Sequence, residues 1–100
     1  MHDMSKLKNL KTMDAAAPNG MKAFWAFDKA VFQEGTVSVL NKQLTAVAVA
    51  LTTQCAYCIE IHTQEARKAG ATDEQLAETA LVAAAIRAGG AVTHATHLFG

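Results

Sequence analysis

Two cysteines and a histidine lie within eight residues of one another, in the run C-A-Y-C-I-E-I-H. They are Cys55, Cys58 and His62, at relative positions i, i+3 and i+7. If this run is helical, each residue turns by about 100°, and the three side chains fall within an arc of about 60°. The spacing therefore predicts one helix face that carries two thiols and an imidazole.

Such a face is suited to redox chemistry. Cys58 and His62 are neighbours one helical turn apart, a spacing that allows direct or water-bridged proton transfer between thiol and imidazole. Cys55 can approach Cys58 closely enough to form a reversible disulfide. The thiolate is the reactive form, and a helix N-terminus together with an imidazole lowers a thiol pKa from about 8.5 toward neutrality. The imidazole favours Cys58 as the activated thiol and the helix dipole favours Cys55; the sequence does not rank these effects.

The cysteines have three other interpretations. They could be small buried hydrophobic residues, but their pairing with a histidine one turn later disfavours this. C-x-x-C pairs also bind zinc, and His62 with His94 or His97 could complete a tetrahedral site. The chain has no second C-x-x-C and no pair of histidines spaced as H-x(3–5)-H, so the redox interpretation is preferred. Haem c attachment is excluded because Ile59, not histidine, follows the second cysteine.

The composition indicates one small domain that associates with copies of itself. The chain has 100 residues, of which 51% are hydrophobic and 18% charged, against a usual charged share of about 25%. A domain of this size buries only about two-thirds of its surface, so an apolar-rich one tends to cover the remainder by oligomerisation. Nine basic residues balance nine acidic ones without a basic stripe, which argues against nucleic acid and anionic membranes as partners.

Neither a membrane span nor a secretory signal is predicted. The apolar run at residues 46–51 is far shorter than the roughly 20 residues needed to cross a bilayer. Residues 1–9 are polar and charged and contain no apolar core of a signal peptide. We therefore expect a cytoplasmic protein, in which two neighbouring cysteines serve catalysis, redox exchange or metal binding more often than structural cross-linking.

The first half of the chain is interpreted as an arm followed by two helices. Residues 1–17 lack a sustained apolar period and end at a break around Pro18 and Gly20. Residues 21–34 show helical apolar spacing, with Gly35 as the predicted stop. Residues 41–51 are apolar nearly all round, which favours a buried helix; a strand is the alternative, but the alanines favour helix.

The second half is predicted to contain the cysteine helix and one further long helix. Thr52 or Thr53 would cap a helix that carries the cysteines and runs to residue 69, with Gly70 as its stop. Thr72 to Gln75 match a capping box, and the alanine-rich helix that follows is predicted to end at residues 89–90. A short final helix would carry His94 and His97, interpreted as residues satisfied by nearby carbonyls. Residues 18–100 thus form a compact all-α bundle.

With these elements in place, residues 24–97 resemble the carboxymuconolactone decarboxylase and alkylhydroperoxidase D superfamily. The peroxidase branch carries C-x-x-C-x-x-x-H on a helix, which Cys55 to His62 match. The run F-D-K-A-V-F at residues 27–32, the apolar run before T-T-Q and the run A-G-G-A at residues 88–91 are also typical of its short members.

The resemblance implies an all-α fold of the alkylhydroperoxidase D type and assembly into homotrimers or hexamers. It also implies a dithiol that reduces hydroperoxides and is re-reduced by a thiol reductant or redox protein, without cofactor or metal. The decarboxylase branch lacks this cysteine pair, so the namesake activity is not expected.

The sequence departs from the family pattern beside the histidine. Relatives in the peroxidase branch have a glutamate about twelve residues before the first cysteine, which completes a proton relay with the histidine, whereas this chain has Gln43. An amide can orient an imidazole but cannot take its proton. Glu65 is a substitute if its helix continues, although a surface position suits it better, and Glu34 is a more distant candidate. Tyr57 replaces a family histidine and will not act as a base near neutrality.

The sequence therefore predicts a thiol peroxidase in which Cys55 and Cys58 cycle between dithiol and disulfide with help from His62. Two alternatives are a non-enzymatic redox sensor or oligomeric scaffold, and a zinc-binding Cys/His site.

Overall fold

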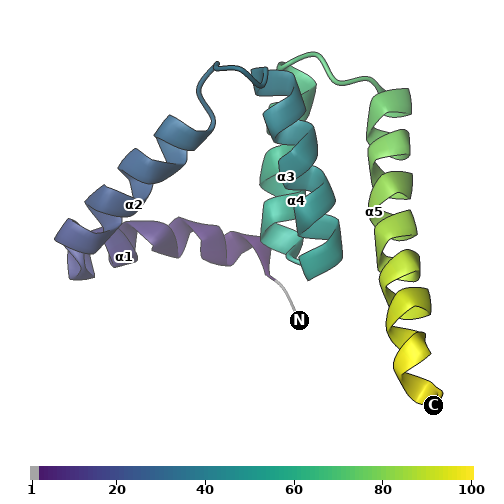
Figure 1. The fold of residues 1–100 in the computed structure, drawn as a ribbon. Coiled ribbons are helices and arrows are strands. Elements are labelled where there is room, and N and C mark those ends of the chain that lie inside the picture. Colours follow the sequence, from purple (N-terminus) through teal and green to yellow (C-terminus); the bar gives the residue numbers. More distant parts are fainter. Residues whose placement is uncertain (1–2) are drawn as a thin grey trace. The chain divides into compact units, whose positions relative to one another are not determined.

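The computed structural model describes residues 3–100, and this part of the chain is all-helical (Figure 1). It contains five α-helices and two short 3-10 helices. The chain divides into two compact units, one of the described residues up to Val39 and one of Leu40–Gly100. Each unit is described by itself. All the candidate residues except Glu34 belong to the second unit.

The N-terminal unit is helical almost throughout; of the arm predicted at residues 1–17, residues 1 and 2 lie outside the described part. It consists of η1 (Met4–Asn9), α1 (Leu10–Ala16) and α2 (Pro18–Val31). The Asp3 carboxylate caps η1 by accepting from the backbone N–H of Ser5 at 3.0 Å. A contact distant in sequence also ties α1 to α2, because the Trp25 indole N–H donates to the Asp14 carboxylate at 2.7 Å. The arm is therefore joined to α2 by a side-chain hydrogen bond that periodicity does not reveal.

The start of α2 also differs from the sequence-based expectation. Pro18 occupies the first turn of α2, three residues before the predicted start, and the break lies at Ala17 (φ −134°, ψ 67°). Proline fits this position because the first helical N–H groups have no intrahelical acceptor. The helix ends at Val31, before the predicted end at residue 34.

In the C-terminal unit, α3 (Val39–Thr53) packs its buried face against the end of α4 (Ala56–Lys68). Gln43, Val47 and Ala50 are the buried residues of α3, spaced at i, i+4 and i+7 along one helix face. Val47 forms a small core with two alanines at or just after the end of α4, Ala66 and Ala71. Four partly buried leucines pack against this core: Leu40, Leu44, Leu51 and Leu76. The helix predicted at residues 41–51 is confirmed and is slightly longer at both ends.

The turn between α3 and α4 shows that neither threonine caps the cysteine helix, contrary to prediction. Thr52 and Thr53 are the last residues of α3, and their hydroxyls donate back to the Val49 carbonyl at 2.7 and 3.0 Å. Gln54 then takes a left-handed conformation (φ 59°), and the N–H of Cys55 donates to the Ala50 carbonyl at 3.0 Å. This is the six-residue bond that closes a Schellman-type helix end. Cys55 itself is the N-cap of α4.

The second turn confirms two sequence predictions. Gly70, with φ 104°, ends α4, and the Ala71 N–H donates to the Ala66 carbonyl at 2.9 Å. The capping box then opens α5 (Asp73–His94): the Gln75 N–H donates to the Thr72 hydroxyl at 3.1 Å, and the Thr72 N–H donates to the Gln75 side chain at 2.9 Å.

The predicted stop at Gly89 and Gly90 is wrong, because α5 continues to His94 and is followed by η2 (Ala95–Leu98). Glycine costs a helix interior only about 1 kcal/mol relative to alanine, so two glycines among alanines lower helix stability without ending it. His94 therefore closes the long helix, and only His97 lies in the short one.

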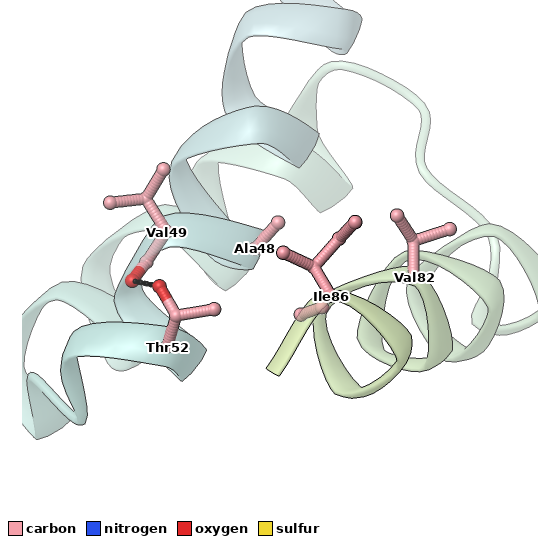
Figure 2. A pocket seen from close by; sticks show the side chains of 6 residues that line it. Ala48, Val49, Thr52, Val82 and Ile86 are labelled. Atoms are coloured by element: carbon pink, nitrogen blue, oxygen red, sulfur yellow. Dashed lines mark hydrogen bonds between the residues drawn. The ribbon is translucent and has the colours of Figure 1, made fainter. Parts of the chain in front are cut away.

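Much of α5 is apolar and exposed. Ala83 is its buried residue, whereas Ile86 is 69% and Val92 72% exposed. Shallow apolar hollows of about 190 and 300 Å³ lie between α3 and α5, and Figure 2 shows Val82 and Ile86 facing Ala48 across the first of them. Within residues 3–100, the segment Asp73–Leu98 is long and apolar enough to cross a membrane by length and composition alone, a test that core helices of globular proteins also pass.

Candidate active site

The two cysteines lie at the start of α4, where the backbone leaves the turn after α3. Cys55 has an extended conformation (φ −87°, ψ 99°), and Cys58 lies in the first turn of the helix. Their Cα atoms are 5.3 Å apart, and the two sulfurs form a disulfide. This Cα separation falls within the usual range for disulfides, so the N-cap residue and a residue of the first helical turn are close enough to be bridged.

Cys55 uses its sulfur as the cap of α4. The backbone N–H of Cys58 points at the Cys55 Sγ at 3.2 Å. The first N–H groups of a helix lack intrahelical acceptors and carry the positive end of the helix dipole, so they favour a negative charge at this position. A helix N-terminus is in general a favourable location for a thiolate.

His62 lies one turn after Cys58 and is held from behind by Gln43 of α3. The Nδ1 of His62 is 2.8 Å from the Gln43 Oε1. An amide oxygen can only accept, so Nδ1 carries the proton in this bond, and the neutral ring has its basic lone pair on Nε2. Gln43 is only 6% exposed. The orientation of the imidazole is therefore fixed by a buried residue of a neighbouring helix.

The other two glutamates considered for the relay have different partners. Glu65 is on α4, where its carboxylate accepts from the Lys68 ammonium at 3.3 Å and its side chain is 45% exposed. Glu34 belongs to the N-terminal unit and accepts the backbone N–H of Val39 at 2.9 Å. Within the C-terminal unit the structure thus brings Gln43, and not Glu65, into hydrogen-bonding contact with His62.

The site is reachable from solvent. Cys55, Tyr57, Cys58 and His62 are all partly buried, in contrast to the buried Gln43 behind them. A small molecule can approach such a site, while the residue that orients the imidazole is shielded from water. This partial exposure suits a reacting thiol pair more than a sealed structural disulfide.

The two late histidines form a separate pair at the end of α5. The His94 Nδ1 donates to the Gly90 carbonyl at 2.9 Å, and the His94 and His97 rings are 6.2 Å apart. The predicted satisfaction by a nearby carbonyl holds for His94. In residues 3–100 no group of three or more histidine, cysteine or acidic side chains is arranged to hold a metal ion.

Two features beside the cysteines were missed by the sequence analysis. Gln54 adopts a left-handed conformation, which gave no signal because glycine usually fills such positions. Arg87 of α5 donates through Nη1 to the Thr52 carbonyl at 3.0 Å. A contact between residues 35 positions apart cannot be read from local periodicity.

Comparisons with known proteins agree with this architecture. Residues 18–99 match the model of the carboxymuconolactone decarboxylase family. A solved structure from Methanobacterium thermoautotrophicum is similar, with a TM-score of 0.81, 38% identity, and coverage of 86% of this chain and 97% of that one. The apo form of a carboxymuconolactone decarboxylase family protein from Legionella pneumophila has a TM-score of 0.80 and 29% identity, with coverage of 92% and 82% respectively.

Sequence relatives give the same result. Uncharacterized protein 4 in the cox locus of Paracoccus denitrificans is 53% identical over 73 residues, which are 73% of this chain and 66% of that protein. An uncharacterized protein of Cupriavidus necator is 43% identical over 63 residues, which are 63% of this chain and 56% of that protein. The chain thus spans less than two-thirds of the length of these relatives. By its matched residues, its five helices and these relatives, the chain belongs to the carboxymuconolactone decarboxylase family.

Proposed function

We propose that this protein is a thiol-dependent peroxidase that reduces hydroperoxides with the Cys55–Cys58 pair. The observation that supports it most is the arrangement on α4: two cysteines in the first turn, and an imidazole one turn later that Gln43 holds by Nδ1 at 2.8 Å. A structural disulfide needs neither a partly exposed site nor an oriented base. A peroxidase needs both.

The proposed cycle balances with a hydroperoxide and two reducing thiols. A cysteine thiolate attacks the outer peroxide oxygen, so that an S–O bond forms, the O–O bond breaks, and the alkoxide leaves as an alcohol after taking a proton. The second cysteine then displaces water from the sulfenic acid, and the disulfide forms. A dithiol or a redox protein supplies two electrons and two protons to restore both thiols.

We assign the attack to Cys58 and the resolving step to Cys55. Cys58 is one turn from His62, whose Nε2 lone pair can take a thiol proton. Cys55 accepts the Cys58 N–H at the helix start, which stabilises it as the leaving thiolate when the reductant opens the disulfide. Trapping the sulfenic acid with dimedone tests this assignment. Cys55→Ser should give the adduct on Cys58, whereas an adduct found only on Cys55 in the Cys58→Ser variant would reverse the roles.

Peroxide-dependent oxidation of dithiothreitol tests the function as a whole. We expect turnover in the full chain, loss of turnover in Cys58→Ser, and a fall of about 10²-fold or more in His62→Ala, because general-base assistance is typically worth that much. His94→Ala is the matched control, since His94 bonds only within α5 and should leave the rate unchanged. A wild-type rate no faster than that of Cys58→Ser would contradict a peroxidase.

The second candidate is a redox sensor or scaffold without turnover. The neutral Gln43 favours it, because an amide gives the imidazolium less stabilisation than a carboxylate would. In that case peroxide would still close the disulfide once per chain, but catalytic consumption would not follow. Counting peroxide molecules consumed per protein chain separates the two functions.

We also propose that the chain assembles into a homo-oligomer, a trimer or hexamer as the family resemblance implies. The support is the apolar surface of α5, where Leu81, Val82, Ile86 and Val92 are each more than 60% exposed. Light scattering at micromolar concentration should give the mass of at least three chains. A monomer that partitions into lipid vesicles would instead indicate that α5 contacts a membrane.

A further inference from the structure

Arg87 of α5 contacts the turn that leads into the redox pair. Its Nη1 donates to the Thr52 carbonyl at 3.0 Å. Thr52 belongs to the last turn of α3, where carbonyls have no intrahelical donor and the helix dipole favours a cation. Arg87 is also the only Asp, Glu, Lys or Arg between Glu78 and the end of the chain. This isolated charge therefore has a specific polar partner three residues before Cys55.

The turn itself is held in a conformation that its residues do not favour. Gln54 has φ 59°, a left-handed conformation that costs a residue with a Cβ about 1–2 kcal/mol. The Cys55 N–H is anchored to the Ala50 carbonyl at 3.0 Å. Arg87 adds an anchor from a different helix, on the other side of Gln54. The position of Cys55 relative to α4 therefore depends on contacts that hold Gln54 from both sides.

We propose that Arg87 is a positioning residue for the redox pair: by holding the Thr52 carbonyl, it keeps the Cys55 thiol close to Cys58 and so favours the disulfide. This rests on the redox cycle proposed above. Disulfide closure within one chain becomes more favourable as the two thiols spend more time at bonding distance, because less freedom is lost when the bond forms. A looser turn lowers that effective concentration.

The equilibrium with glutathione measures this quantity without peroxide. Two protein thiols and one oxidised glutathione exchange with one protein disulfide and two reduced glutathiones, so atoms and electrons balance. In Arg87→Met, which keeps an unbranched side chain of good helix propensity but loses the charge and the donor, we expect the equilibrium constant to fall about two- to fivefold. Arg87→Lys should recover most of the loss, because the ammonium can still donate to the carbonyl.

Lys68→Ala is the matched control, because Lys68 is a cation of the same unit that pairs with Glu65 on α4. An equilibrium constant unchanged in Arg87→Met, or shifted equally in Lys68→Ala, would overturn the positioning role. If Arg87→Met loses helix content by circular dichroism, Arg87→Leu takes its place as the variant without a donor: a fall of the same size in a folded Leu variant supports the role, and an unchanged equilibrium overturns it. Absence of peroxidase turnover in the wild type would refute the proposed function but leave this comparison intact.

Discussion

The two turns that flank α4 use the same backbone design with different residues. Before α4, the Cys55 N–H bonds the Ala50 carbonyl around Gln54; after α4, the Ala71 N–H bonds the Ala66 carbonyl around Gly70. Each turn has one residue with positive φ at the equivalent position. The second turn has the residue that tolerates this conformation best, whereas the first has a residue with a side chain.

The N-caps of the helices that follow these turns also differ, and again the second is the more favourable. Thr72 and Gln75 form a reciprocal capping box at the start of α5, with oxygen acceptors at 3.1 and 2.9 Å. Cys55 caps α4 with sulfur, a weak acceptor, at 3.2 Å. The turn after α4 is thus built for stability. The turn before it gives up stability to place a thiol at a helix N-terminus. Three substitutions in the turns test this contrast, and a fourth, at Gln43, tests the histidine beside the thiols.

Cys55→Ser should have the largest effect. Serine is among the best N-cap residues, so the reduced variant should be as stable as the reduced wild type or more stable by up to about 1 kcal/mol. Disulfide formation within the chain is lost, so turnover should fall, and what remains requires dithiothreitol to reduce the Cys58 sulfenic acid directly. Urea unfolding of both reduced proteins, together with the peroxidase assay, checks the prediction. A clear loss of stability would show that the sulfur is the better cap and would remove the contrast.

Gln43→Glu should increase the peroxidase turnover of the site. A carboxylate accepting from the His62 Nδ1 would stabilise the imidazolium formed when the ring takes a thiol proton, so we expect turnover to rise about tenfold. The midpoint of iodoacetamide alkylation against pH should move down. Burying a carboxylate costs stability, so the midpoint of thermal unfolding should fall as well.

His62→Ala in the Gln43→Glu background is the control, because it removes the imidazole through which the carboxylate acts. Turnover should then be low in either background. An unchanged alkylation midpoint in a well-folded Gln43→Glu protein would mean that the residue at position 43 does not influence the thiols, and Glu65 would be the next residue to test.

Gly70→Ala should destabilise the protein by about 1–2 kcal/mol, because φ 104° is strained for any residue with a Cβ. A Cβ added there meets no heavy atom within 4 Å, so the whole effect is attributed to the backbone. Alkylation of the reduced cysteines should be unaffected. Gly20→Ala is the comparison, since Gly20 lies within α2 and should gain stability from the same change.

Gln54→Gly should have the smallest effect and the opposite sign. Relief of the left-handed conformation is partly offset by the greater freedom of glycine in the unfolded chain, which leaves a gain of about 0.5 kcal/mol. The difference should appear in the denaturant midpoint of the reduced protein. A loss larger than about 1 kcal/mol would indicate that the Gln54 side chain makes a stabilising contact that outweighs the backbone strain.

The sequence predicted the parts of the fold that local chemistry determines. Thr72 and Gln75 carry a capping signal within four residues, and Gly70 marks a helix end because few other residues adopt its conformation. The prediction failed where a local signal had a competing explanation. Thr52 and Thr53 resemble N-caps, but their hydroxyls bond carbonyls of the helix that they end. Residues 4–16 are helical without a sustained apolar period, and the hydrogen bond between Trp25 and Asp14 that joins α1 to α2 is not a local signal.

The candidate site likewise contains features that local spacing predicted and features that it did not. The grouping of Cys55, Cys58 and His62 followed from helical spacing, and Gln43 was found only by its offset from a family pattern. Its contact with His62 joins two helices and required the structure. The contact of Arg87 with Thr52 could not be predicted, because an isolated arginine in an alanine-rich helix is usually interpreted as a surface charge that aids solubility.

Trp25, whose indole N–H is hydrogen-bonded to Asp14, is a fluorescent probe of the N-terminal unit. Trp25 is the only tryptophan of the chain and belongs to the N-terminal unit, while the only tyrosine, Tyr57, lies between the two cysteines. Selectively excited indole emission therefore reports on α1 and α2, and tyrosine emission reports on the redox pair. Reduction of the disulfide should change the tyrosine signal directly. A simultaneous change in the indole signal would mean that the redox state is sensed by a part of the chain that contains neither cysteine.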